Sequence, residues 1–154
     1  ALHFFQDQFK NREVEKHYLA LVEGTPPTSQ GRIEASLGRD EAHRQKRSVQ
    51  PPEKGKAAVS IYRVLRSYDK HSLLEVRPLT GRTHQIRVHL AFIGCPVVGD
   101  TMYGYKRPSL PLNRHFLHAS RLALMLPGET TKREFVATMP SELLDILQKL
   151  EKEV

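Results

Sequence analysis

The pattern of apolar and polar residues predicts a chain built mainly of β-strands. The segment 16–23 carries apolar residues on both faces, as expected for a strand in the interior of a sheet. The segments 57–67 and 72–78 are rich in β-branched and aromatic residues and flank a short turn at 68–70, so they are expected to pair as a hairpin. Further strands are expected at 32–35, 121–126 and 133–137.

Apolar residues at helical spacing predict three helices, at the start of the chain, at 83–93 and near the end. Thr83 is expected to cap the second helix, and Gly94 is expected to end it. Strands and helices together predict the α+β class, with a mixed, largely antiparallel sheet flanked by helices. The apolar stripes are Leu2, Phe5 and Phe9, then Ile86, Leu90 and Ile93, and finally Leu143, Leu144, Leu147 and Leu150.

The first residues have the pattern of a helix interior. No initiator Met, N-cap or polar leader precedes the first apolar stripe. A length of 154 residues fits one domain with a substantial core. We therefore expect residues 1–154 to be one part of a longer polypeptide.

The charge balance suits a polyanionic partner. Lys and Arg number 24 against 17 Asp and Glu, which gives a net charge of +7 and a pI near 9.7. This excess favours RNA or DNA, because neutralised phosphates release counterions, although a basic protein without such a partner remains an alternative. Cys95 is the only cysteine, which excludes disulfides and cysteine-based zinc sites and indicates a reducing compartment, the cytoplasm. No apolar run approaches the roughly 18–20 residues of a membrane span, so no membrane association is expected.

Candidate chemistry gathers where a strand runs through Thr80-Gly81 into the second helix. Arg82, His84 and Arg87 cluster at the helix start, where cations oppose the helix dipole. We therefore expect a negative group beside them, either a phosphate or a buried carboxylate. Solvated side chains at a helix start are the alternative.

Metal and nucleophile chemistry find no support in the sequence. His84 and His89 lie five residues apart, so neither a helix nor a strand points both at one ion. Ser120 lacks the glycine pattern of a hydrolase nucleophile, and Cys95 is best explained as a small packed residue. No phosphate-cradling glycine loop is present. Neither a metal nor a cofactor is expected.

One long segment is strongly similar to the signature of the RluA-type RNA pseudouridine synthases: RPLTGRTHQIRVHLAFIGCPVVGDTMYG, residues 77–104. EKHYLALVEG at 15–24 resembles the Lys-x-Tyr strand of that family, and RHFLHASRL at 114–122 resembles its Leu-His-Ala strand. The matches occur in family order, and the last strand and helix also suit it. The resemblance implies an incomplete pseudouridine synthase fold, with residues 1–154 as the C-terminal portion of a single catalytic domain.

The family isomerises uridine in RNA to its C-glycoside without a cofactor or metal. The resemblance implies that Tyr18 is the active-site tyrosine and that Arg87 pairs with the catalytic aspartate. Arg82 and His84 are expected to bind substrate, and Leu90 to wall the pocket, with core packing as the alternative for Leu90. A monomer that acts on ribosomal RNA, rather than transfer RNA, is expected.

The catalytic aspartate of the family belongs to a His-Arg-Leu-Asp motif, and residues 1–154 do not contain it. None of the five aspartates follows Arg-Leu, and Asp100 lies in the signature segment but not at the nucleophile's position. We therefore predict that residues 1–154 alone are inactive while the parent protein is a synthase. The alternative is a non-catalytic RNA-binding relative.

A polar loop at 38–56 is expected near the substrate channel. Four of its cations are expected to contact RNA phosphates, in a way that does not depend on base sequence. A solvated loop without RNA contacts is the alternative. These cations are Arg44, Lys46, Arg47 and Lys56.

Overall fold

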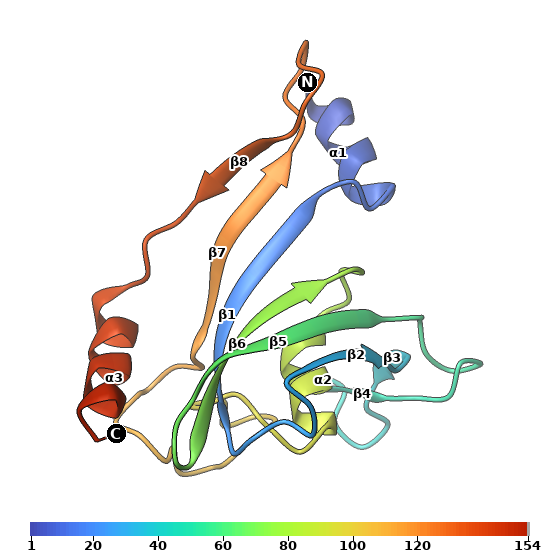
Figure 1. Cartoon of the computed structure of the whole chain (residues 1–154). Coiled ribbons are helices and arrows are strands. Elements are labelled where there is room, and N and C mark those ends of the chain that lie inside the picture. Colours follow the sequence, from blue (N-terminus) through green and yellow to red (C-terminus); the bar gives the residue numbers. More distant parts are fainter. Residues whose placement is uncertain (154) are drawn as a thin grey trace.

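The computed structural model describes residues 1–153, in which it has three helices and eight strands (Figure 1). The helices are α1 (Leu2–Lys10), α2 (Gln85–Phe92) and α3 (Ser141–Lys152). The strands are β1 (Glu15–Glu23), β2 (Gln30–Glu34), β3 (Leu37–Arg39), β4 (Arg47–Val49), β5 (Val59–Ser67), β6 (His71–Pro78), β7 (Leu117–Leu124) and β8 (Arg133–Val136).

Six strands form one sheet in the order β2-β5-β6-β1-β7-β8, and every neighbouring pair is antiparallel. β1 lies between β6 and β7, although both come much later in the chain. This central position explains why both faces of β1 are apolar, and Ala20, Leu21 and Val22 are fully buried. The predicted α+β class with a largely antiparallel sheet is confirmed.

The predicted hairpin is present as β5 and β6, which pair from Ser60 opposite Pro78 to Ser67 opposite Ser72. β7 begins earlier than predicted, at Leu117, and ends at Leu124. His118 and Ser120 interrupt the apolar pattern there, but His118 still pairs with Leu19 of β1, and Ser120 lies at the bulge opposite His17 and Tyr18. Backbone pairing therefore extends the strand beyond its apolar residues.

The expected loop at 38–56 contains an additional hairpin, formed by β3 and β4. Each of these strands has three residues, which is too short for an alternating pattern to stand out. The hairpin packs through Leu37 into a small cluster with Ala58 and Val88, next to α2. This packing holds a basic segment in a fixed place beside α2, as Figure 1 shows.

The core joins the sheet to α2 and α3. α2 lies against β5 and β6 (Figure 1), and α3 lies beside the β5–β6 turn, where Glu151 accepts hydrogen bonds from Arg66 and Tyr68. Leu143, Ile146 and Leu150 of α3 enter the same apolar cluster as the sheet. α1 is tied to the end of β7 by the Gln8 side chain, which donates to and accepts from the Met125 backbone at 2.8 and 2.7 Å. None of the helices described is long and apolar enough to cross a membrane.

Candidate active site

A cavity of about 270 Å³ lies between β1 and the start of α2. Lys16 and Tyr18 line it from β1, because residues two apart share one face of a strand. The segment 80–87 closes the other side. The cavity therefore brings together four residues that the sequence singled out, namely Tyr18, Arg82, His84 and Arg87.

The turn before α2 is held by a buried glutamine. The Gln85 side chain accepts hydrogen bonds from Thr80 Oγ1 at 2.6 Å and from the Arg82 backbone N–H at 3.1 Å. Its amide donates to the Val59 carbonyl at 2.8 Å and to Ser60 Oγ at 2.9 Å. All polar atoms of this side chain thus have partners, and they fix the turn to β5.

Thr83 does not cap α2, so that prediction is wrong. His84 occupies the N-cap position in the left-handed conformation, with φ of +56°, and makes no capping hydrogen bond of its own. Gln85 instead satisfies the backbone N–H of Arg82, a role that a search for Ser or Thr caps would not find. A positive φ costs energy in a residue other than glycine, and such residues cluster at functional sites.

Arg87 forms a two-point ion pair with Asp100. Arg87 Nε donates to Oδ2 at 2.7 Å, and Nη2 donates to Oδ1 at 2.9 Å. The Asp100 side chain is fully buried, and that of Arg87 is 15% exposed. The sequence led us to expect a carboxylate from outside residues 1–154 as the partner of Arg87. The carboxylate in contact with it is Asp100, and Nη1 bonds to none of the residues described.

Asp100 is placed by its own loop. The backbone N–H groups of Met102 and Tyr103 both donate to Oδ1 at 3.1 Å. Gly99 precedes it with φ of +80°, and a Cβ there would lie 2.0 Å from the Arg114 carbonyl oxygen, so only glycine fits. Burial acts to raise the pKa of the Asp100 carboxyl, but the bonds from Arg87 and the loop outweigh it and hold the pKa below its ordinary value.

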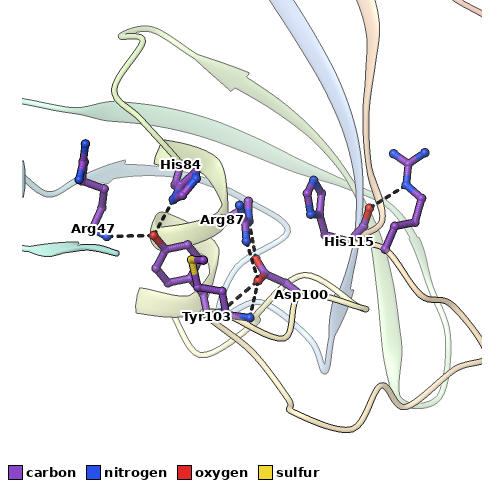
Figure 2. A network of polar contacts seen from close by, with 8 residues as sticks. Arg47, His84, Arg87, Asp100, Tyr103 and His115 are labelled. Carbon is purple, nitrogen blue, oxygen red and sulfur yellow. Dashed lines mark hydrogen bonds and ion pairs between the residues drawn. The ribbon is translucent and has the colours of Figure 1, made fainter. Parts of the chain in front are cut away.

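Tyr103 connects this ion pair to the cavity and to the β3–β4 hairpin, as Figure 2 shows. Its hydroxyl lies 2.7 Å from His84 Nδ1 and accepts a hydrogen bond from the Arg47 backbone N–H at 2.9 Å. The Arg87 guanidinium lies over the Tyr103 ring, 5.0 Å from its centre. Burial, and then the charges of Arg87 and Arg47, lower the pKa of His84.

A family model described as RNA pseudouridylate synthase matches residues 1–92. That match includes β1 with Tyr18 and the whole of α2 with Arg87. The chain belongs to the RNA pseudouridylate synthase family.

Relatives and solved structures agree with this assignment. An "Uncharacterized RNA pseudouridine synthase" of Chloroflexus aurantiacus is 44% identical over 151 residues, covering 98% of this chain and 47% of that protein. The "Ribosomal large subunit pseudouridine synthase D" of Borreliella burgdorferi is 35% identical over 147 residues, covering 96% of this chain and 44% of that protein. The structure of "Human RNA Pseudouridylate Synthase Domain Containing 1" superposes with a TM-score of 0.76 at 30% identity, covering 97% of this chain and 70% of that one. The chain spans about half the length of the curated relatives it matches.

One residue carried over from the pseudouridine synthase family does not line the cavity. Leu90 is fully buried and belongs to the core cluster. It follows Ile86 by four residues, so it lies on the same helical face one turn deeper into the protein. The prediction that Leu90 walls the pocket is therefore wrong, and core packing, its alternative, is what the structure shows. Ile86 occupies the apolar wall instead.

A second basic surface of this synthase-family chain adjoins the cavity at Arg82. This hairpin groove, of about 450 Å³, lies between β3–β4 and the turn 81–83. It includes Arg47 and Lys56 from the predicted set but neither Arg44 nor Lys46, which lie on the turn before β4. The cations that line it are Arg39, Arg47, Lys54, Lys56 and Arg82.

The family signature pointed to Arg87 but not to its partners, Asp100 and Tyr103. The sequence feature that could have indicated them is the Gly-Asp-Thr-Met-Tyr-Gly stretch, in which Asp100 follows a glycine and precedes Tyr103 by three residues. Lys16 was also missed, although its place two residues before Tyr18 puts both on one strand face. Within residues 1–153, no three His, Cys, Asp or Glu side chains gather as a metal site would require.

Proposed function

We propose that the complete gene product is an RNA pseudouridine synthase and that residues 1–154 form the base-binding part of its active site. The observation that carries this proposal is the cavity that holds both Tyr18 and Arg87, in a chain of the pseudouridylate synthase family. Lys16, Arg82 and His84 on the same cavity supply polar and cationic groups for a nucleotide.

In this proposal the target uridine leaves the base stack and enters the cavity, at a cost of a few kcal/mol. The N1–C1′ bond breaks, the uracil turns, and C5 bonds to C1′. The C5 proton is then lost, and N1 ends protonated. The Tyr18 ring stacks on the base, and its hydroxyl is placed to take part in the proton transfer from C5.

The nucleophilic carboxylate of this scheme comes from a His-Arg-Leu-Asp segment, which residues 1–154 do not contain. Arg87 has Nη1 free of bonds to the described residues, so it can hold that carboxylate in its charged form while it keeps Asp100. Asp100 itself is a poor nucleophile, because it is fully buried and accepts four hydrogen bonds. We therefore propose that residues 1–154 alone do not isomerise uridine.

RNA would reach the cavity along the hairpin groove. Arg47, Lys56 and Arg82 line this groove and are proposed to contact phosphates, with Arg44 and Lys46 extending the contact onto the turn. Ribosomal RNA is the favoured substrate, since two relatives carry the name ribosomal large subunit pseudouridine synthase D. We further propose a cytoplasmic monomer that needs no cofactor.

Release of tritium from RNA that contains 5-tritiated uridine tests the proposal, because only loss of the C5 proton frees the label. The complete gene product should release tritium from ribosomal RNA, whereas residues 1–154 should not. Turnover by residues 1–154 would overturn the proposed inactivity. RNA binding without turnover by the complete gene product would instead identify a non-catalytic RNA-binding relative.

A further inference from the structure

The hydrogen atoms around the Tyr103 hydroxyl can be assigned from its partners. The Arg47 backbone N–H, 2.9 Å away, can only donate, so the Tyr103 oxygen accepts that bond. The oxygen could accept a second bond, but His84 Nδ1, at 2.7 Å, is the only acceptor among the described residues for the phenolic hydrogen, so this hydrogen is satisfied only when it is donated to Nδ1. A neutral imidazole has one donor and one acceptor nitrogen. His84 therefore carries its own hydrogen on Nε2.

The Nε2–H of His84 is available to a ligand. His84 lines the cavity beside Tyr18 and Arg87, and no described residue bonds to its Nε2. The two rings also meet edge to face, at 70° with centres 5.5 Å apart, which favours this orientation of the imidazole. The left-handed backbone of His84 further restricts the direction of its side chain.

We propose that Tyr103 is a positioning residue, which holds His84 in the Nε2–H form so that this hydrogen is donated to a carbonyl oxygen of the extruded uracil. This inference rests on the proposed function, since it names the ligand of the same cavity. His84 is thus the residue that reads the base, and Tyr103 acts through it without touching the substrate.

A carbonyl suits this donor better than a phosphate does. Burial and the nearby charges of Arg87 and Arg47 lower the pKa of His84, so the ring is neutral at pH 7. A neutral N–H matches the neutral oxygen of uracil, whereas a phosphate would favour a charged imidazolium and already has Arg82 and Lys16 on the same cavity.

The first arm of the test measures the tautomer without RNA. The chain has eight histidines, so the complete gene product is labelled with ¹⁵N-histidine and the signal that His84→Gln removes is assigned to His84. In the unsubstituted protein, Nε2 should show the shift of a protonated nitrogen and Nδ1 that of an acceptor. In Tyr103→Phe the two signals should move toward each other as the forms mix. Tyr105→Phe, an exposed tyrosine of the same loop, is the matched control and should change neither.

The second arm measures turnover. Tyr103→Phe should lower kcat/KM by about three- to tenfold, the effect of one hydrogen bond, while its thermal midpoint stays near that of Tyr105→Phe. His84→Gln, which keeps an N–H donor, should retain more turnover than His84→Leu. Tyr103→Phe with unchanged tautomer signals, or with unchanged kcat/KM, overturns the proposal.

A third arm identifies the acceptor. Uridine-containing RNA is added to the labelled Tyr18→Phe protein, in which the base is bound but turned over slowly. His84 should stay neutral at pH 7 if it meets a carbonyl. A second protonated nitrogen at that pH would indicate a phosphate and would overturn the proposal. Failure of the unsubstituted protein to release tritium would count against the proposed function alone, since the tautomer is measured without turnover.

Discussion

The cavity and the hairpin groove meet at Arg82 but differ in whether their cations are paired with carboxylates. On the cavity side, Arg87 is bound at two points by a fully buried carboxylate and lies over the Tyr103 ring. In the groove, Arg47 and Lys56 form no ion pair with any residue described. The ion pair of Lys54 with Glu41, at 3.3 Å, is exposed.

This difference indicates that the cavity holds its side chains in fixed positions, whereas the groove attracts RNA by charge. A buried two-point ion pair fixes the direction of a guanidinium and is little affected by salt. Exposed cations without partners attract a polyanion from any direction, and salt screens them. Substitutions in the cavity should therefore change chemistry or stability, whereas substitutions in the groove should change RNA affinity and its salt dependence.

The largest effect is expected from Tyr18→Phe in the complete gene product. Loss of the hydroxyl should lower single-turnover tritium release by about 10²–10³-fold, the usual contribution of a positioned acid or base. RNA affinity should change little, because phenylalanine keeps the ring for stacking. Tyr68→Phe, which lines a different pocket beside α3, is the control. Equal losses of tritium release in the two variants would show that the Tyr18 hydroxyl takes no part in the reaction.

The next effect concerns stability. Asp100→Asn leaves Arg87 largely buried without a countercharge and should lower the free energy of unfolding by about 3 kcal/mol, measured by chemical denaturation. The matched control is Glu142→Gln, which breaks the exposed pair with Arg114 and should have little effect. If Asp100→Asn is equally mild, Arg87 is solvated and the contrast between the two regions fails.

Elements with a strong local pattern could be predicted from the sequence. Apolar and β-branched residues predicted β1 and the β5–β6 hairpin. Family motifs pointed to Tyr18 and Arg87. These features depend on neighbours in the chain or on a long motif. The α+β class followed from the same elements, because adjacent strands tend to pair.

Features made by distant residues could not be predicted. Gln85 replaces Thr83 in holding the α2 start because β5 happens to present the Val59 carbonyl and Ser60 to it. Asp100 supplies the anion expected beside Arg87, but only the folded loop brings the two together. The pocket role of Leu90 came from the family resemblance, whereas its place in the apolar stripe of α2 agrees with its burial in the core.

A smaller effect, on RNA affinity, should distinguish the cations that line the hairpin groove from those on the turn before β4. Arg47→Ala combined with Lys56→Ala should weaken binding to all RNAs alike and lower the salt slope by about 2, one unit for each phosphate contact. Arg44→Ala combined with Lys46→Ala removes the same charge from outside the groove and should lower the slope less. Slopes from filter binding at several salt concentrations decide this. Equal reductions would show that Arg44 and Lys46 contribute as much to phosphate binding as Arg47 and Lys56 do, and that the groove has no special part in it.

The smallest effect is a pH dependence of stability that comes from a buried histidine behind the cavity wall, between α2 and β5. His89 is buried in α2, where Nε2–H donates to the Ala35 carbonyl at 2.9 Å and Nδ1 accepts from Ser60 at 2.8 Å. A second proton would have to displace the Ser60 hydrogen.

Burial lowers the pKa of His89 below its ordinary value of 6.5, so below that pH the unfolded chain binds a proton that the folded chain does not. The free energy of unfolding should therefore fall as the pH drops from 7 toward 5.5, less steeply in His89→Gln than in the unsubstituted protein. The pKa values of His17, His84 and His115 are also lowered, so the stability of the variant should still depend on pH, but less strongly. Parallel profiles for the two proteins would mean that His89 titrates as freely in the fold as in the unfolded chain, and that its buried network does not exclude a second proton.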